Sequence, residues 1–212
     1  MKILMLNGSS NPGGATKAGL DEMAEVFAAE GLETEILCVG PKPVRDCIGC
    51  GKCAELGRCV FGDDPVNDFV AKAAAADGFV FGTPVYYAHP AGRVLSFLDR
   101  AFYSDMWATG AAAFRHKPAA AVAVARRAGT TASWDVMNKY FGISQMLAVG
   151  STYWNGFHAR TPGDVPGDPE GLQTLRNLAR NMAWLVRCLA AARAAGIPPP
   201  QTETGHMTNF VR

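Results

Sequence analysis

Short continuous runs of apolar residues alternate along this chain with longer segments whose apolar residues recur every three or four positions. The short runs predict five buried strands, and the longer segments predict five helices. The predicted strands span residues 2–6, 33–39, 78–82, 118–125 and 145–150, and the predicted helices span residues 16–30, 65–76, 91–103, 132–141 and 170–195. This alternation predicts an α/β fold, a doubly wound five-stranded parallel sheet with helices on both faces. We expect the strand order 2-1-3-4-5, in which a ligand binds beyond the carboxyl ends of the strands, beside the first strand.

Residues 1–195 form one predicted domain, because no internal repeat or low-complexity tract interrupts the alternation. Three consecutive prolines, Pro198 to Pro200, mark a linker-like stretch, and residues 196–212 are therefore predicted to form a C-terminal tail. Chain ends commonly fray, yet this tail carries Phe210 and Arg212, an unusual pair to leave loose in solvent. We predict that the tail packs across a neighbouring subunit, with fraying as the alternative.

The composition is typical of a folded domain, since 49% of the 212 residues are hydrophobic and 18% are charged. The 20 Lys and Arg residues nearly balance the 19 Asp and Glu residues, so we expect neither a nucleic-acid partner nor a polybasic membrane contact. The longest apolar runs fall well below the ~20 residues that a membrane span needs. The first residues lead into a strand and a glycine loop without a secretory signal, so we expect a cytoplasmic protein.

The loop after the first predicted strand is rich in small and hydrogen-bonding residues and leads into a helix. Its candidate phosphate-binding residues are Ser9, Ser10, Asn11, Gly14, Ala15 and Thr16. A helix N-terminus offers unpaired N–H groups and the positive end of the helix dipole, and both favour a phosphate. The loop has neither the lysine of a nucleoside-triphosphate loop nor a G-x-G-x-x-G motif, so a phosphate monoester is the better expectation. The alternative is a turn with a helix cap, which the same residue types form.

Two further loops follow the third and fourth predicted strands and should meet the first loop at the same edge of the sheet. Their candidate cofactor-binding residues are Pro84, Val85, Tyr86, Tyr87 and Ala88 after the third strand, and Arg126, Arg127, Ala128, Gly129 and Thr130 after the fourth. The first of these loops offers aromatic rings, and the second offers backbone N–H groups and two cations. A flat, partly apolar ring with electron-rich heteroatoms suits the space between them.

Nearly the whole chain resembles the NADPH-dependent FMN reductase branch of the flavodoxin-like superfamily, through three motifs in the expected order: G-S-S-N-P-G-G-A-T, D-G-F-V-F-G-T-P-V-Y-Y and R-R-A-G-T-T. The resemblance implies an FMN whose phosphate binds at Ser9, Asn11, Ala15 and Thr16, and whose isoalloxazine lies against residues 84–87. It also implies that residues 126–130 meet the pyrimidine side of the ring, that NAD(P)H is the co-substrate, and that the protein is a homodimer or homotetramer. The arginine pair in the third motif departs from the acid-rich loops of electron-carrier flavodoxins, and positive charge near the flavin N1 favours two-electron chemistry.

Four of the six cysteines lie within one short segment, at Cys47, Cys50, Cys53 and Cys59. In a reducing compartment such a group indicates a metal, an iron–sulfur cluster or redox chemistry before it indicates disulfides. The compact spacing is typical of a [4Fe–4S] cluster, and it resembles the motif of the iron–sulfur flavoproteins, which are FMN proteins of the same fold. It departs from the bacterial ferredoxin motif, in which the last spacer is shorter and a proline follows. Zinc and free or redox-active thiols remain alternatives, although zinc sites usually pair two separated cysteine knuckles.

Three hypotheses for the function follow. The leading one is an FMN-dependent NAD(P)H oxidoreductase that passes hydride to flavin N5 and on to a flavin, quinone, nitro- or azo-aromatic or protein acceptor, with the chemistry carried by FMN. The alternative is an iron–sulfur flavoprotein, an electron carrier whose [4Fe–4S] cluster exchanges electrons with FMN and a ferredoxin-like partner. The third is a non-catalytic binding module with zinc on the cysteines.

Two groups of charged residues receive structural interpretations. Asp63 and Asp64 precede a predicted helix, where acidic residues form N-caps and favour the helix dipole. No metal is needed to explain them. Asp99 and Arg100 lie near the end of a predicted helix and are interpreted as an ion pair or an interface contact.

Overall fold

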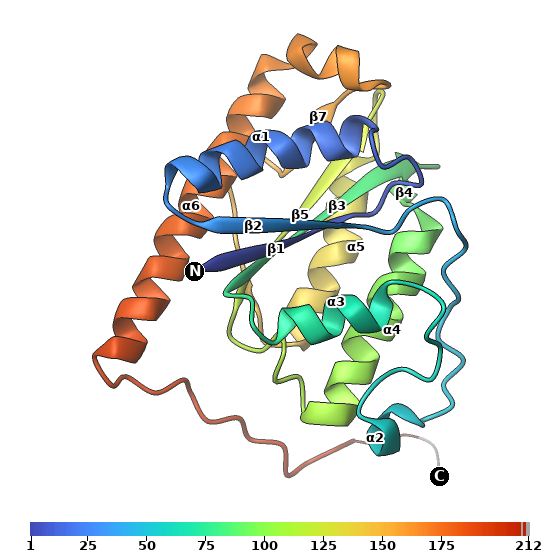
Figure 1. Ribbon diagram of the computed structural model, residues 1–212, viewed down its shortest axis with the longest axis vertical. Coiled ribbons are helices and arrows are strands. Elements are labelled where there is room, and N and C mark those ends of the chain that lie inside the picture. Colours follow the sequence, from blue (N-terminus) through green and yellow to red (C-terminus); the bar gives the residue numbers. More distant parts are fainter. Residues whose placement is uncertain (209, 211–212) are drawn as a thin grey trace.

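The computed structural model describes residues 1–208 and 210, and its centre is a parallel β-sheet covered by helices on both faces (Figure 1). The strands are β1 (Lys2–Asn7), β2 (Glu33–Cys38), β3 (Gly78–Tyr86), β4 (His89–Pro90), β5 (Pro118–Ala125), β6 (Leu147–Ala148) and β7 (Gly156–His158). The helices are α1 (Ala15–Ala29), α2 (Cys53–Leu56), α3 (Val66–Ala73), α4 (Gly92–Thr109), α5 (Thr130–Ile143), the 3-10 helix η1 (Pro162–Gly167) and α6 (Pro169–Ala194). The main path through the sheet is β2-β1-β3-β5-β6, and its pairs are all parallel. The expected α/β class with a parallel sheet is therefore confirmed.

In the described residues the sheet has seven strands, so the expectation of a five-stranded sheet was wrong. β4 pairs antiparallel with the end of β3. The predicted fifth strand shrinks to β6, which pairs with the beginning of β5, whereas β7 pairs with the end of β5. Between Val149 and Gly156 the chain leaves this edge of the sheet as a loop. The side-chain amide of Asn155 joins the two ends of this loop by donating to the Val149 carbonyl at 3.1 Å. Two short strands share the edge because β5 is longer than the apolar run that pairs with it.

Each face of the sheet is covered by its own set of helices. α1 and α6 pack on one face, and α3, α4 and α5 pack on the other (Figure 1). Within β1, Ile3 and Met5 belong to the layer under α1 and α6, whereas Leu4 and Leu6 belong to the opposite layer, as the period of two in a strand requires. The central strands are thus buried on both faces, which explains why they are continuous apolar runs instead of alternating ones.

Helix α4 extends six residues beyond its predicted end at Tyr103 and finishes at Thr109. Ser104 and Asp105 interrupt the apolar pattern at that point, yet both are buried. The Asp105 carboxylate accepts the Thr109 hydroxyl at 2.6 Å, so its burial is compensated within the helix. The helix ends where Gly110 adopts a left-handed conformation with a φ of 70°.

The tail after α6 runs without regular secondary structure through its described residues. Thr202 donates its hydroxyl to the side-chain oxygen of Gln145 at 2.8 Å. Packing of the tail on a neighbouring subunit stays a prediction, and residues 209, 211 and 212 of the tail lie outside the described residues. In the part of the chain that the structure describes, no helix combines the length and the apolar character that crossing a membrane requires.

Candidate functional site

A pocket of about 280 Å³ opens at the carboxyl edge of the sheet, where the loops after β1, β3 and β5 meet. It is lined by Ser9, Ser10, Asn11, Gly14, Ala15, Thr16, Pro84, Val85, Tyr86, Val124, Ala125, Arg126, Ala159 and Arg160. The structure therefore brings together all six candidates of the first loop, three candidates that form the end of β3, and one after β5. That these residues bind a cofactor stays a prediction.

Buried Asn7, at the end of β1, shapes the first loop. Its Oδ1 accepts the Ser9 N–H at 3.2 Å, and its Nδ2 donates to the Pro12 carbonyl at 3.2 Å. The Ser9 hydroxyl in turn accepts the Asn11 N–H at 3.1 Å. Helix α1 begins after Gly14, and no side chain among the described residues caps it. The side chains of the loop thus hold the loop itself, and the N–H groups in the first turn of α1 remain available to a ligand.

The loop after β3 is a tight hairpin that packs on the loop after β5. Tyr87 and Ala88 at its tip have positive φ angles of 52° and 57°, which residues with a side chain seldom adopt. Gly129 has a φ of 97°, and a Cβ placed there would lie 2.5 Å from the Ala88 Cα. The hairpin after β3 and the loop after β5 are therefore in close contact, and each stabilises the conformation of the other. The candidates that lie outside the pocket lining are Tyr87, Ala88, Arg127, Ala128, Gly129 and Thr130.

Four lining residues were not expected from the sequence, namely Val124, Ala125, Ala159 and Arg160. The first two end β5, and the other two follow β7, the strand that the apolar pattern did not predict. The N–H groups of Thr161 and Arg160 donate to the Asp164 carboxylate at 2.7 and 3.0 Å, and these bonds hold the pKa of Asp164 below its usual range. Two arginines, Arg126 and Arg160, thus border the pocket from different loops.

The groups around this pocket differ in chemistry from one side to the other. Backbone N–H groups and hydroxyls surround the N-terminus of α1, where a phosphate binds well. Pro84, Val85 and Tyr86 provide an apolar and aromatic surface, and the two arginines provide positive charge. This donor set fits a flavin mononucleotide, which combines a terminal phosphate with a flat ring.

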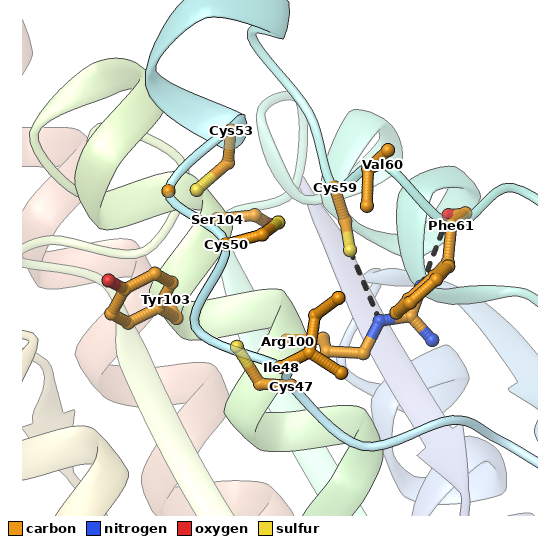
Figure 2. Close-up of a pocket in the computed structure, with 11 residues that line it drawn as sticks. Cys47, Ile48, Cys50, Cys53, Cys59, Val60, Phe61, Arg100, Tyr103 and Ser104 are labelled. Atoms are coloured by element: carbon orange, nitrogen blue, oxygen red, sulfur yellow. Dashed lines mark hydrogen bonds between the residues drawn. The ribbon is translucent and has the colours of Figure 1, made fainter.

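A second, small pocket of about 20 Å³ lies between α4 and the cysteine loop, which is the segment 39–65 between β2 and α3 (Figure 2). Its lining includes all four candidate metal ligands, Cys47, Cys50, Cys53 and Cys59. Gly49 and Gly51, which alternate with the first three cysteines, have positive φ angles of 62° and 69°, and such angles allow sharp turns. Among the described residues, no three His, Cys, Asp or Glu side chains gather closely enough to hold a single metal ion. Four thiols around one space nevertheless fit the all-cysteine ligand set of a [4Fe–4S] cluster.

Arg100 reaches from α4 into the cysteine loop (Figure 2). Its Nε donates to the Cys59 Sγ at 3.2 Å, and its guanidinium forms a buried ion pair with Asp64. Burial by itself lowers the pKa of Arg100, but the hydrogen bonds to Asp64 and Cys59 outweigh burial and raise that pKa. Burial also raises the pKa of the Cys53 thiol, and the nearby sulfurs of Cys50 and Cys59 raise it further.

The sequence interpretation of Arg100 needs a correction. It forms an ion pair as expected, but with Asp64 and not with its neighbour Asp99, which accepts the Tyr140 hydroxyl at 2.5 Å. The expected cap role of Asp63 and Asp64 was wrong, because the N-cap of α3 is Pro65, although the Asp64 carboxylate accepts the N–H of Val66, the first residue of α3, at 3.2 Å. Sequence reasoning missed the place of Arg100 beside the cysteines, since Cys59 lies 41 positions away along the chain.

Comparison with known proteins shows which family this chain resembles in sequence and fold. Residues 1–160 match the NADPH-dependent FMN reductase family. An iron–sulfur flavoprotein of Methanocaldococcus jannaschii is 33% identical over 196 residues, which cover 89% of this chain and 99% of that relative.

Two solved structures show the same fold. RosB with the bound intermediate 8-demethyl-8-formylriboflavin-5′-phosphate matches with a TM-score of 0.67 and 18% identity, over 100% of this chain and 92% of that one. A flavodoxin from the domain Archaea matches with a TM-score of 0.58 and 12% identity, over 88% of this chain and 99% of that one. The fold is thus flavodoxin-like, and by its sequence match the chain belongs to the NADPH-dependent FMN reductase family.

Proposed function

We propose that this protein is an iron–sulfur flavoprotein, an electron carrier with FMN in the larger pocket and a [4Fe–4S] cluster on Cys47, Cys50, Cys53 and Cys59. The observation that carries the proposal is that all four cysteines line one pocket. The nearly full-length match to an iron–sulfur flavoprotein of Methanocaldococcus jannaschii supports it. When bound, FMN supplies hydride and electron chemistry, and the cluster supplies single-electron exchange.

The arrangement of the sulfurs favours a cluster over zinc. Four thiolates around one zinc ion must all approach a single point to within about 2.3 Å. The described cysteines surround a space instead of meeting at a point. A cubane does not require the four thiolates to meet at one point, because each thiolate binds a different iron of the cluster. The sequence already favoured a cluster over zinc, but it put an FMN-dependent NAD(P)H oxidoreductase first and the iron–sulfur flavoprotein second, and this proposal reverses that order.

Within this proposal, each loop around the larger pocket has a separate task. The uncapped N-terminus of α1, with Ser9, Asn11 and Thr16, would hold the FMN phosphate by hydrogen bonds. The segment 84–86 would support the ring, and Arg126 would offset negative charge on it. No protein nucleophile or general acid is required, because these residues bind and orient the cofactor while leaving one face of the ring open.

The second candidate function is an FMN-dependent NAD(P)H oxidoreductase whose cysteines stay free. The two arginines at the pocket, Arg126 and Arg160, favour it. Cations beside an open flavin site suit the phosphates of NAD(P)H and stabilise an anionic reduced flavin. A quinone, a nitro- or azo-aromatic compound, a free flavin or a protein would then accept the electrons.

Absorbance and metal content of anaerobically purified protein test the proposal. We expect the bands of oxidised flavin over a broad shoulder, with about four irons per chain as a cubane requires. Cys50→Ser should lose the iron and keep the flavin. Cys188→Ser is the matched control, because Cys188 is an exposed cysteine of α6 that does not line the pocket, and it should keep both.

Each other outcome contradicts the proposal in a different way. Flavin without iron, together with rapid NAD(P)H oxidation, would establish the second candidate function. Zinc in a colourless protein would indicate a binding module. A chain that fails to bind added FMN would refute both flavin proposals.

The partners of this protein belong to the same proposal. An electron carrier needs a donor and an acceptor, and a ferredoxin-like protein suits a single-electron cluster. We also propose a homodimer or homotetramer, in which the tail contacts a neighbouring subunit. Light scattering on the full chain measures that assembly directly.

A further inference from the structure

Arg100 is the largest fully buried side chain in the described part of the chain, and it lies in the wall of the cysteine pocket. It belongs to α4, yet its hydrogen bonds go to the loop before and after α2. Besides the bond to Cys59 and the ion pair with Asp64, the guanidinium donates to the carbonyls of Arg45 at 3.3 Å and Phe61 at 3.1 Å. One side chain thus ties four points of the cysteine loop to the folded domain.

The bond to Cys59 gives the buried Nε–H of Arg100 its partner, whereas the charge of the guanidinium is compensated by other groups. The Asp64 carboxylate already neutralises the guanidinium, and two carbonyls satisfy other N–H groups. A neutral thiol is a weak hydrogen-bond acceptor, whereas a sulfur that carries negative charge is a good partner for a cationic N–H. The geometry of Arg100 therefore suits a Cys59 sulfur that is a metal ligand.

We propose that Arg100 is a positioning residue that holds the Cys59 sulfur by an N–H···S hydrogen bond and makes a cluster on this loop easier to reduce. The inference rests on the proposed [4Fe–4S] cluster. Reduction adds one negative charge to the site, and a cationic donor 3.2 Å from a ligand sulfur stabilises the reduced state more than the oxidised one. Net charge and hydrogen bonds to the sulfurs are among the factors that set the potential of such clusters.

Asp64 should act in the opposite direction. Its side chain is almost fully buried against Arg100, so its negative charge offsets part of the positive charge beside the sulfur. Removing the charge of Arg100 should therefore lower the reduction potential, and removing the charge of Asp64 should raise it. If the ion pair were purely structural, the two substitutions would not shift the reduction potential in opposite directions, because each of them breaks the same contact.

The experiment compares Arg100→Gln, Arg100→Lys and Asp64→Asn with the iron-loaded wild type, in redox titrations followed by electron paramagnetic resonance. We expect Arg100→Gln to weaken the affinity of the cluster for an electron about tenfold, a shift of about 59 mV to lower potential. Arg100→Lys keeps the charge and should restore part of the difference, and Asp64→Asn should shift the potential upward. The matched control is Arg93→Gln, since Arg93 is also on α4 but donates to the carbonyls of Gly40 and Lys42. It should leave the potential unchanged.

A measurement on the wild type keeps the inference testable if Arg100→Gln does not fold. Protein labelled with ¹⁵N-arginine should show a nitrogen coupling to the reduced cluster in pulsed spectra, and Arg93→Gln should retain that coupling. Equal potentials in wild type and Arg100→Gln, shifts of the same sign in Arg100→Gln and Asp64→Asn, or no arginine coupling would each overturn the inference while leaving the cluster in place. A wild-type chain without iron would instead overturn the proposed function, and this inference with it.

Discussion

Gly129→Ala tests whether the loop after β5 belongs to the flavin site. Gly129 has a φ of 97°, and residues with a Cβ pay about 1–2 kcal/mol in the left-handed region. The added Cβ would also lie 2.5 Å from the Ala88 Cα and 2.8 Å from the Val85 Cγ1, well inside the ~3.5–4.0 Å of an ordinary carbon contact. The neighbour is the backbone of a hairpin whose tip already has two positive φ angles, so it has little freedom to move away.

We expect the two effects together to cost about 2–3 kcal/mol. If FMN binding requires the observed arrangement of the hairpin and the loop, that cost falls on the bound state and weakens FMN binding by about 30- to 150-fold. Titration of flavin-free protein with FMN, followed by quenching of the flavin fluorescence, measures the dissociation constant. Urea unfolding of the same flavin-free samples measures the stability separately.

Gly142→Ala is the matched control. Gly142 lies in α5, and a Cβ there would meet nothing within 4 Å among the described residues. This substitution should raise the stability by about 0.5–1 kcal/mol, because alanine is a better helix former than glycine, and should leave FMN binding unchanged. A Gly129→Ala protein that is less stable but binds FMN as tightly as the wild type would refute the reasoning, since the strained loops would then lie outside the site.

Three further predictions concern other parts of the molecule. Asn7→Ala should lower the free energy of unfolding by about 1–3 kcal/mol and weaken FMN binding, because the Ser9 N–H and the Pro12 carbonyl lose their partner. Urea unfolding measures the first effect and FMN titration the second. Unchanged FMN binding would count against the proposed role of the loop. Hydrogen bonds from Lys2 and Lys72 lower the pKa of Glu35 below 4.5, so its stabilisation is present above that pH and is lost as the pH falls through the lowered value. Glu35→Gln should therefore be less stable than wild type at pH 7 by up to about 1 kcal/mol, and the difference should shrink as the pH falls through the lowered pKa of Glu35. A difference that persists in acid would contradict the argument. Deletion of residues 197–212 should reduce the assembled fraction in light scattering, and an unchanged assembly would mean that the tail frays.

Much of the fold can be predicted from the sequence because the buried strands are continuous apolar runs. β1 and β5 are buried on both faces, and their apolar runs end within a residue or two of the observed strands. β7 gives no comparable signal, because only Phe157 of its three residues is buried, and the strand exists because the end of β5 lacks another partner. The end of α4 was missed for a related reason, since the buried Asp105 is compensated by a hydrogen bond that the apolar pattern does not reveal.

The residues of the candidate sites also differ in whether the sequence alone can predict them. The phosphate loop and the four cysteines are local in the sequence, so their spacing alone predicts them. Arg160 and Arg100 reach their sites through the fold: the first follows an unpredicted strand, and the second contacts a loop far away in the sequence. A lone arginine in a helix has no local pattern that distinguishes a surface cation from one that touches a sulfur, so only the tertiary structure identifies it.

One helix connects the two candidate sites. Gly8 begins the phosphate loop, and a Cβ on it would lie 2.2 Å from the Val94 Cγ2, so this loop packs directly on the first turns of α4. Arg100, six residues further along the same helix and about 9 Å along its axis, holds the cysteine loop. A rigid helix in contact with both loops keeps their separation constant, and electron exchange between two cofactors depends on that separation. The attachment of the cysteine loop to α4 therefore supports the proposed electron exchange between the two sites over a purely structural role for the cysteines.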